Sequence, residues 1–213
     1  MTQKKENPPN NRAVKITASA FGALAGITGI ISGVFEIQQG NIPPSSLWTS
    51  FIGPAYSMYE NNAYTVMTIV PNFFLTGTLA LLISSITLLW SIRYIHSKNG
   101  SKVMLLLSIA QTLVGGGWVL DLGLFTSLLA TIIQSPLTWW RKHLPKCAVR
   151  LLTQLYPWAL RSFSIMSIML LGSTLLGVNN EAFVSLITPI AAIMIFPTPL
   201  MIIGGIAHDV QHT

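Results

Sequence analysis

Charge is scarce in this sequence. Only 8% of its 213 residues are Asp, Glu, Lys or Arg, whereas 51% are hydrophobic. A soluble domain carries about 25% charged residues, so this chain lacks the polar surface that a water-soluble fold of its length requires. Acids are scarcer than bases, with six against 12. This composition excludes an ordinary soluble protein and favours a membrane as the solvent for most of the chain.

Cysteine and catalytic signatures are also lacking. Cys147 is the single cysteine, which excludes an intrachain disulfide and a multi-cysteine metal centre. The sequence contains no phosphate-binding loop, dinucleotide fingerprint or G-x-S-x-G motif. We therefore expect no cofactor, and nothing in these motifs supports a conventional enzyme.

Long apolar runs are what the chain does have. The most continuous one, residues 66–92, ends in the basic cluster Arg93, His96 and Lys98. A helix needs about 20 residues to cross a bilayer core of about 30 Å. The sequence therefore predicts an all-α, polytopic membrane bundle over residues 13–207, between a disordered cytoplasmic tail at 1–12 and a cytoplasmic tail at 208–213. The six predicted transmembrane helices cover residues 13–37, 66–92, 102–120, 124–140, 162–178 and 182–207.

The Lys and Arg residues predict the orientation. All 12 fall in the segments that this arrangement places on one side of the membrane. Loops rich in Lys and Arg stay in the cytoplasm, so we predict that both termini are cytoplasmic. The cations form separate clusters between apolar runs, which argues against nucleic-acid binding and for contact with anionic lipid at the cytoplasmic face.

The first apolar run has an alternative interpretation. Residues 4–15 are basic, and Ala23-Leu24-Ala25 resembles the cleavage site of a secretory signal peptide. The run continues to Phe35, which favours a helix that is retained. Cleavage would leave the predicted topology of the later spans unchanged.

Small residues form a stripe in the same run. Ala18, Gly22, Gly26, Gly29 and Gly33 recur every three or four positions and therefore share one face of a helix. Such faces let a second helix approach closely. We predict that the stripe packs against a helix of this chain, of a second copy or of a membrane-protein partner.

Polar features are expected near the outer ends of the spans. Glu36 and Asp121 are candidates for a paired carboxylate site that binds a cation or relays protons, and the alternative is that Glu36 faces interfacial water. In the long outer loop at 38–65, residues 47–52 are expected to form a short helix lying on the membrane surface. The triplet Gly115-Gly116-Gly117 is a candidate break in the third span.

The last apolar run contains three prolines. Pro189, Pro197 and Pro199 interrupt the predicted sixth span. Proline within a membrane helix usually produces a kink that neighbouring helices tolerate. Two prolines so close together also suit an unwound segment, and broken helices line the substrate sites of transporters.

The chain end carries one metal-like pattern. His208-Asp209-Val210-Gln211-His212 has the histidine spacing of the zinc motif H-E-x-x-H. On a helix the two histidines would share a face. A shorter acid replaces the usual glutamate and no third ligand is evident, so His208 and His212 are a weak metal candidate.

Three segments carry a family resemblance. GVFEIQQGN at 33–41, PNFFLTGTLALL at 71–82 and VGGGW at 114–118 resemble segments of small, uncharacterised bacterial multi-pass membrane proteins. The resemblance covers the first four predicted spans and leaves the last two without a match. It implies a bacterial inner-membrane protein and assigns no site residue.

Three functional hypotheses follow. The first is a structural or accessory membrane subunit, because the chain has a helix-packing face and no ionisable residue near the centre of a span. The second is a small-solute transporter or channel that uses the prolines of the sixth span. The third is a membrane-embedded metalloenzyme that uses His208 and His212.

Overall fold

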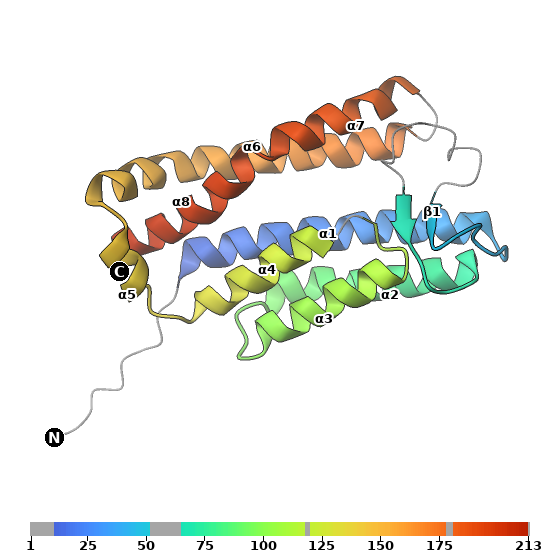
Figure 1. Cartoon of the computed structure of the whole chain (residues 1–213), viewed down its shortest axis with the longest axis horizontal. Helices are drawn as coiled ribbons and strands as arrows, with labels where there is room; N and C mark the ends of the chain where they lie inside the picture. The colour runs from blue at the N-terminus through green and yellow to red at the C-terminus, as the bar shows by residue number, and fades with distance from the viewer. Residues whose placement is uncertain (1–10, 52–64, 118–119, 178–180, 213) are drawn as a thin grey trace.

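The chain folds into a mostly helical bundle with one small β-hairpin (Figure 1). The computed structural model describes residues 11–51, 65–117, 120–177 and 181–212. Residues 1–10 of the predicted N-terminal tail lie outside the described part of the chain. The elements are α1 (Arg12–Gln39), β1 (Trp48–Ser50), β2 (Thr65–Met67), α2 (Phe73–Arg93), α3 (Gly100–Leu113), α4 (Leu120–Ile133), α5 (Thr138–His143), α6 (Lys146–Gly177), α7 (Glu181–Met194) and α8 (Pro197–His212).

Four helical segments of the described residues are long and apolar enough to cross a membrane. They cover Arg12–Gln39, Phe73–Arg93, Lys146–Leu176 and Ser185–His212. The helices α3 and α4 have 14 residues each, which corresponds to about 21 Å at 1.5 Å per residue. α3 ends before the predicted span 102–120 does, because residues 114–117 are not helical. α4 ends at Ile133, before Pro136, whereas the predicted span 124–140 continued past that proline.

The second predicted span begins later than its apolar run suggested. Residues 65–67 form a strand, and α2 starts only at Phe73. Asn72 caps this helix, because its side-chain oxygen accepts a hydrogen bond of 3.1 Å from the Leu75 N–H. Pro71 before it has no N–H to continue a helix towards the N-terminus. Local cap chemistry therefore sets this boundary more sharply than hydropathy does.

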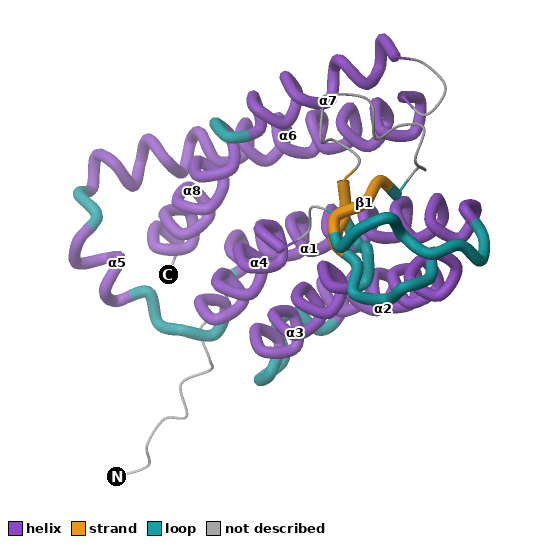
Figure 2. Tube along the Cα trace, turned by 45° about the vertical axis from the view of Figure 1, so that its right-hand side comes forward, coloured by secondary structure: helices purple, strands orange, loops and turns teal. Residues whose placement is uncertain are grey.

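Residues 48–50 form a strand where a surface helix was predicted. β1 pairs antiparallel with β2, with Trp48 opposite Met67. The hairpin is joined to the segment after α3, since the Gly115 N–H donates to the Met67 carbonyl over 2.9 Å. Residues 52–64 lie outside the described part of the chain. Figure 2 shows the strands in orange at the end of the bundle opposite the C-terminus.

The central element is α1, which packs against α2, α4, α6 and α8. In its N-terminal half the aromatic contacts are made by Phe21, which is fully buried. The Phe21 ring meets Phe163 of α6 edge to face at 5.0 Å between centroids, and Phe125 of α4 at 6.0 Å. These rings connect α4 and α6 across the N-terminal half of α1.

The last third of the chain differs from the predicted spans. Residues 146–161, between the predicted fourth and fifth spans, join the fifth span in one 32-residue helix, α6. The sixth span is broken, because α7 ends at Met194 and α8 begins at Pro197, whose ring cannot supply the N–H of a continuous helix. Residues 208–212, predicted as a cytoplasmic tail, are the last residues of α8.

Candidate functional site

The small-residue stripe of α1 is used inside the chain. All five of its residues are buried. A Cβ atom added to Gly26 would lie 2.7 Å from the Leu88 Cβ, and one added to Gly33 would lie 2.8 Å from the Gly77 carbonyl oxygen. Both contacts are with α2, so the two backbones touch where side chains are missing. The stripe is therefore covered by α2, and a second protein chain has no access to it.

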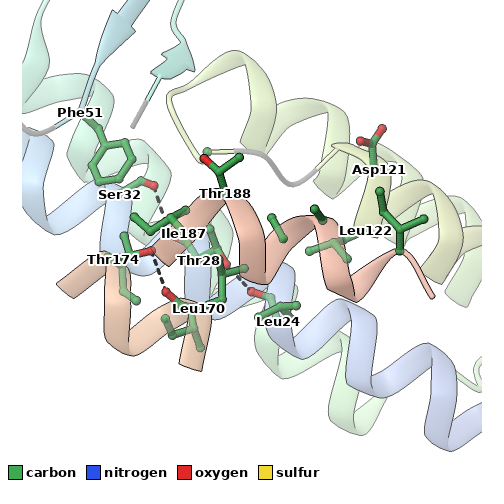
Figure 3. A pocket seen from close by; sticks show the side chains of 16 residues that line it. Leu24, Thr28, Ser32, Phe51, Asp121, Leu122, Leu170, Thr174, Ile187 and Thr188 are labelled. Carbon is green, nitrogen blue, oxygen red and sulfur yellow. Dashed lines mark hydrogen bonds between the residues drawn. The ribbon is translucent and has the colours of Figure 1, made fainter. Parts of the chain in front are cut away.

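A cavity of about 700 Å³ lies on another side of α1 (Figure 3). Its walls come from α1, α4, α6 and α7, with Phe51 after β1 and Gly117 after α3. Most lining side chains are apolar, and they include Leu24, Leu170 and Ile187. The size is typical of a pocket for a small organic ligand.

The cavity exists because α7 and α8 pack differently. α8 packs against both α6 and α1, whereas α7 packs chiefly against α6. The chain changes direction at Ile195 and Phe196, between the two helices. The helices α6 and α7 therefore form one layer and α1 to α4 another. The two layers are joined through α8, and they diverge along α7. Ile195 lines the cavity at this break.

Hydroxyl groups supply most of the polarity of the cavity. The Thr28 hydroxyl donates to the Leu24 carbonyl at 2.9 Å, and the Thr174 hydroxyl donates to the Leu170 carbonyl at 2.9 Å (Figure 3). The Ser32 hydroxyl donates to the Thr28 carbonyl at 3.2 Å. Their hydrogens are engaged within their own helices, so the oxygens remain available as acceptors. The lining thus suits a mainly apolar molecule with a few hydrogen-bond donors.

The sequence analysis missed these hydroxyl residues. Leu24, Thr28, Ile31 and Ser32 follow one another at helical spacing, and all four line the cavity. Their spacing was visible in the sequence, but hydroxyl residues in membrane helices also bond to their own backbone without any ligand. The contribution of α6 and α7 could only come from tertiary packing.

The predicted pair of outer carboxylates is in two different environments. Asp121 is exposed and lines the cavity. Glu36 is 0% exposed and lies against Gly115, which corrects the expectation that it faces interfacial water. The cause is the segment after α3, which breaks the predicted third span. Gly115 and Gly117 both have positive φ angles, of 84° and 82°, a conformation that favours glycine.

The three prolines border the helix break without lining the cavity. Pro189 is exposed within α7, and Pro199 is exposed in the first turn of α8. Pro197 is buried and begins α8. Of this region, the cavity includes Ile195 and four residues of α7 but none of the prolines.

The histidine pattern is helical, and its acid has a structural role. The His208 and His212 rings stack at 4.4 Å between centroids. The Asp209 carboxylate accepts the Ala13 N–H at 3.0 Å and the Val14 N–H at 2.9 Å, so it caps α1. Among the described residues, no group of three or more His, Cys, Asp or Glu side chains is placed to hold a metal ion.

Comparison with known proteins yields no relative. No protein-family model matches the chain, and neither does any curated protein or solved structure. The function is therefore argued from the geometry of the cavity.

Proposed function

We propose that this chain is an accessory protein of the bacterial plasma membrane that holds one lipid-like amphiphile in the cavity between α1 and α7. The observation that carries the proposal is a cavity of about 700 Å³ with apolar walls and hydroxyl acceptors, lined by α1 and α4 and by α6 and α7. A lipid-like molecule offers both chemistries, because its chains are apolar and its glycerol or head-group region carries donors.

Six crossings with both termini in the cytoplasm fit this proposal. Basic residues gather at the end of the bundle where Figure 1 places both termini, as at Lys15 near the start of α1 and Arg93 at the end of α2. The α3–α4 hairpin contacts both ends of α1: the Asn11 side chain donates to the Ile132 carbonyl at 2.7 Å, and Gly115 lies against Glu36. The hairpin thus extends along the whole of α1, although its helices are short.

The depth of the cavity indicates the outer leaflet as the source of the ligand. Thr28 and Ser32 follow Lys15 by 13 and 17 residues in α1, which corresponds to about 20 and 26 Å along the helix. The hydrocarbon core is about 30 Å thick. The hydroxyl groups therefore lie in the outer half of the membrane.

Anionic lipid at the cytoplasmic face is a second expected contact. Lys142, Lys146 and Arg150 lie at the junction of α5 and α6, and all three are exposed. Each basic residue near an anionic bilayer contributes about 1 kcal/mol of attraction. This contact orients the chain and involves no defined pocket.

Native mass spectrometry of the purified full-length protein tests the proposal. We expect a bound amphiphile that survives detergent exchange in the wild type. Ala191→Trp places a large side chain in the cavity and should abolish this binding. Leu106→Trp, at an exposed position of α3, is the matched control and should retain it. Equal retention by both variants, or a wild type without any bound amphiphile, would contradict the proposal.

Small-solute transport is the second candidate, because the α7–α8 break borders the cavity at Ile195. Broken helices of this kind form the sites of several transporter folds. Uptake of labelled sugars and amino acids into proteoliposomes distinguishes the two. Concentration-dependent uptake that Ala191→Trp blocks would favour transport over amphiphile binding.

A further inference from the structure

The last turns of α1 contain a buried carboxyl group that the proposed amphiphile site does not use. Glu36 is 0% exposed. Neither of its side-chain oxygens has a hydrogen-bond partner within the described residues. A buried polar group without a partner requires an explanation, and a carboxyl group has the strictest requirement because its charged form must be compensated.

Two glycines create the space that Glu36 occupies. A Cβ atom added to Gly115 would lie 2.1 Å from the Glu36 Oε1 atom, and one added to Gly77 would lie 2.9 Å from the Glu36 Cβ. The carboxyl group is therefore enclosed between α2 and the segment after α3. The Gly115 N–H does not compensate it, because that donor bonds the Met67 carbonyl.

Charged side chains on the elements packed around Glu36 lie elsewhere. In α2 the charged residue is Arg93, 16 residues beyond Gly77, which places it about 24 Å further along the helix. In α3 it is Lys102, at the opposite end of the helix from Gly115. In α4 it is Asp121, an exposed acid that would repel a second negative charge.

Charged groups on α6 and α8 do not approach Glu36 either. Asp209 of α8 bonds the start of α1, at the far end of that helix. Arg161 of α6 is exposed, and its guanidinium lies over the Trp158 ring at 5.7 Å. Within the described residues, no cation is therefore placed to neutralise an ionised Glu36.

The same interface contains two more unpartnered polar atoms. They are Ser84 Oγ of α2 and Gln111 Oε1 of α3. Both side chains lie beside Gly29, two helical turns before Glu36 in α1. These two atoms are therefore about 10 Å along α1 from Glu36 and do not compensate its carboxyl group.

We propose that Glu36 is a proton-binding site, in which the carboxylate takes up one proton from the aqueous phase at the β1–β2 end and becomes a neutral carboxylic acid. The neutral acid needs no counter-ion, so it can stay in this enclosure where no cation is placed to neutralise a carboxylate. The proton reaches it past Gly115, which lies against the carboxyl group. The site is independent of the proposed amphiphile.

Infrared spectroscopy of the full-length protein in lipid bilayers tests the site. A neutral carboxylic acid gives a C=O stretching band that is separate from the carboxylate bands. We expect this band at neutral pH, a shift when glutamate is labelled with ¹³C, and a further shift in D₂O that reports exchange with solvent. Glu36→Gln should remove the band, and the control Asp121→Asn should leave it. Absence of the band from the wild type would overturn the proposal.

Thermal unfolding of the wild type and of Glu36→Gln is a second, independent test of the proposal. Glutamine has the shape of protonated glutamate and no charge, so the melting temperature of Glu36→Gln should stay close to that of the wild type. A melting temperature of the wild type that rises with sodium concentration, while that of Glu36→Gln does not, would show a bound metal cation in place of the proton. A Glu36→Gln variant that fails to fold would also contradict the proposal.

Discussion

Asp209→Ala is expected to destabilise the bundle by roughly 3 to 6 kcal/mol, because it removes two hydrogen bonds to a charged group, which contribute about 1.5 to 3 kcal/mol each. The two bonds are those that the buried carboxylate accepts from the Ala13 and Val14 N–H groups. α1 has no local substitute, since the Asn11 side chain makes no cap hydrogen bond. The carboxylate also lies at the positive end of the α1 dipole.

Asp209→Asn should fall between the wild type and Asp209→Ala, because it keeps one acceptor and loses the charge. For a chain of this size each kcal/mol corresponds to about 2 to 4 °C, so the alanine variant should melt roughly 6 to 24 °C below the wild type. Thermal unfolding of the purified protein in detergent measures both variants. His212→Ala, at an exposed position one turn further along α8, is the matched control.

The result that would refute this reasoning is an Asp209→Ala variant that melts with the wild type. In that case the start of α1 would be stabilised by its packing alone. A loss of similar size in His212→Ala would show instead that the end of α8 is sensitive to any substitution. Only the graded order of alanine, asparagine and wild type supports a charged cap on α1.

Three further predictions test other parts of the fold. Gly115→Ala should cost about 1 to 3 kcal/mol of stability, measured by thermal unfolding, because its φ is 84° and a Cβ would contact the Glu36 carboxyl; an unchanged melting temperature would contradict the described turn. Asn72→Ala should cost about 1 kcal/mol through loss of the α2 cap on Leu75, detectable in the same assay. Cys147, the exposed natural cysteine, should react with a membrane-impermeant maleimide in inverted vesicles and not in sealed cells, and labelling of sealed cells would reverse the proposed orientation.

Much of the fold was predictable from the sequence. The apolar runs predicted the long helices, and the spacing of Gly26 and Gly33 predicted a close helix contact, whose partner the structure identifies as α2. Helix ends were less accurate, because caps and prolines such as Asn72 and Pro197 act within one turn and hydropathy averages over many residues. Orientation rests on the Lys and Arg positions and stays a prediction, as does the family resemblance.

The candidate site was predictable only in fragments. Glu36 and Asp121 were both selected as functional acids, yet one is fully buried and the other is exposed at the cavity. The acid of the histidine pattern suggested a metal site, whereas Asp209 caps a helix that begins 197 positions earlier. Sequence patterns identify the residue types that are able to act, and the neighbours of each residue decide its role.

The sequence alone determined which segments leave water and where basic residues interrupt them, because these properties depend only on local composition. Tertiary structure decided which helix faces meet. Lipid and protein interior are equally apolar, so hydropathy does not distinguish a side chain that faces the bilayer from one that faces another helix. The cavity beside α7, the enclosure of Glu36 and the cap from Asp209 to α1 all arise from contacts between distant segments, and only the folded bundle brings those segments together.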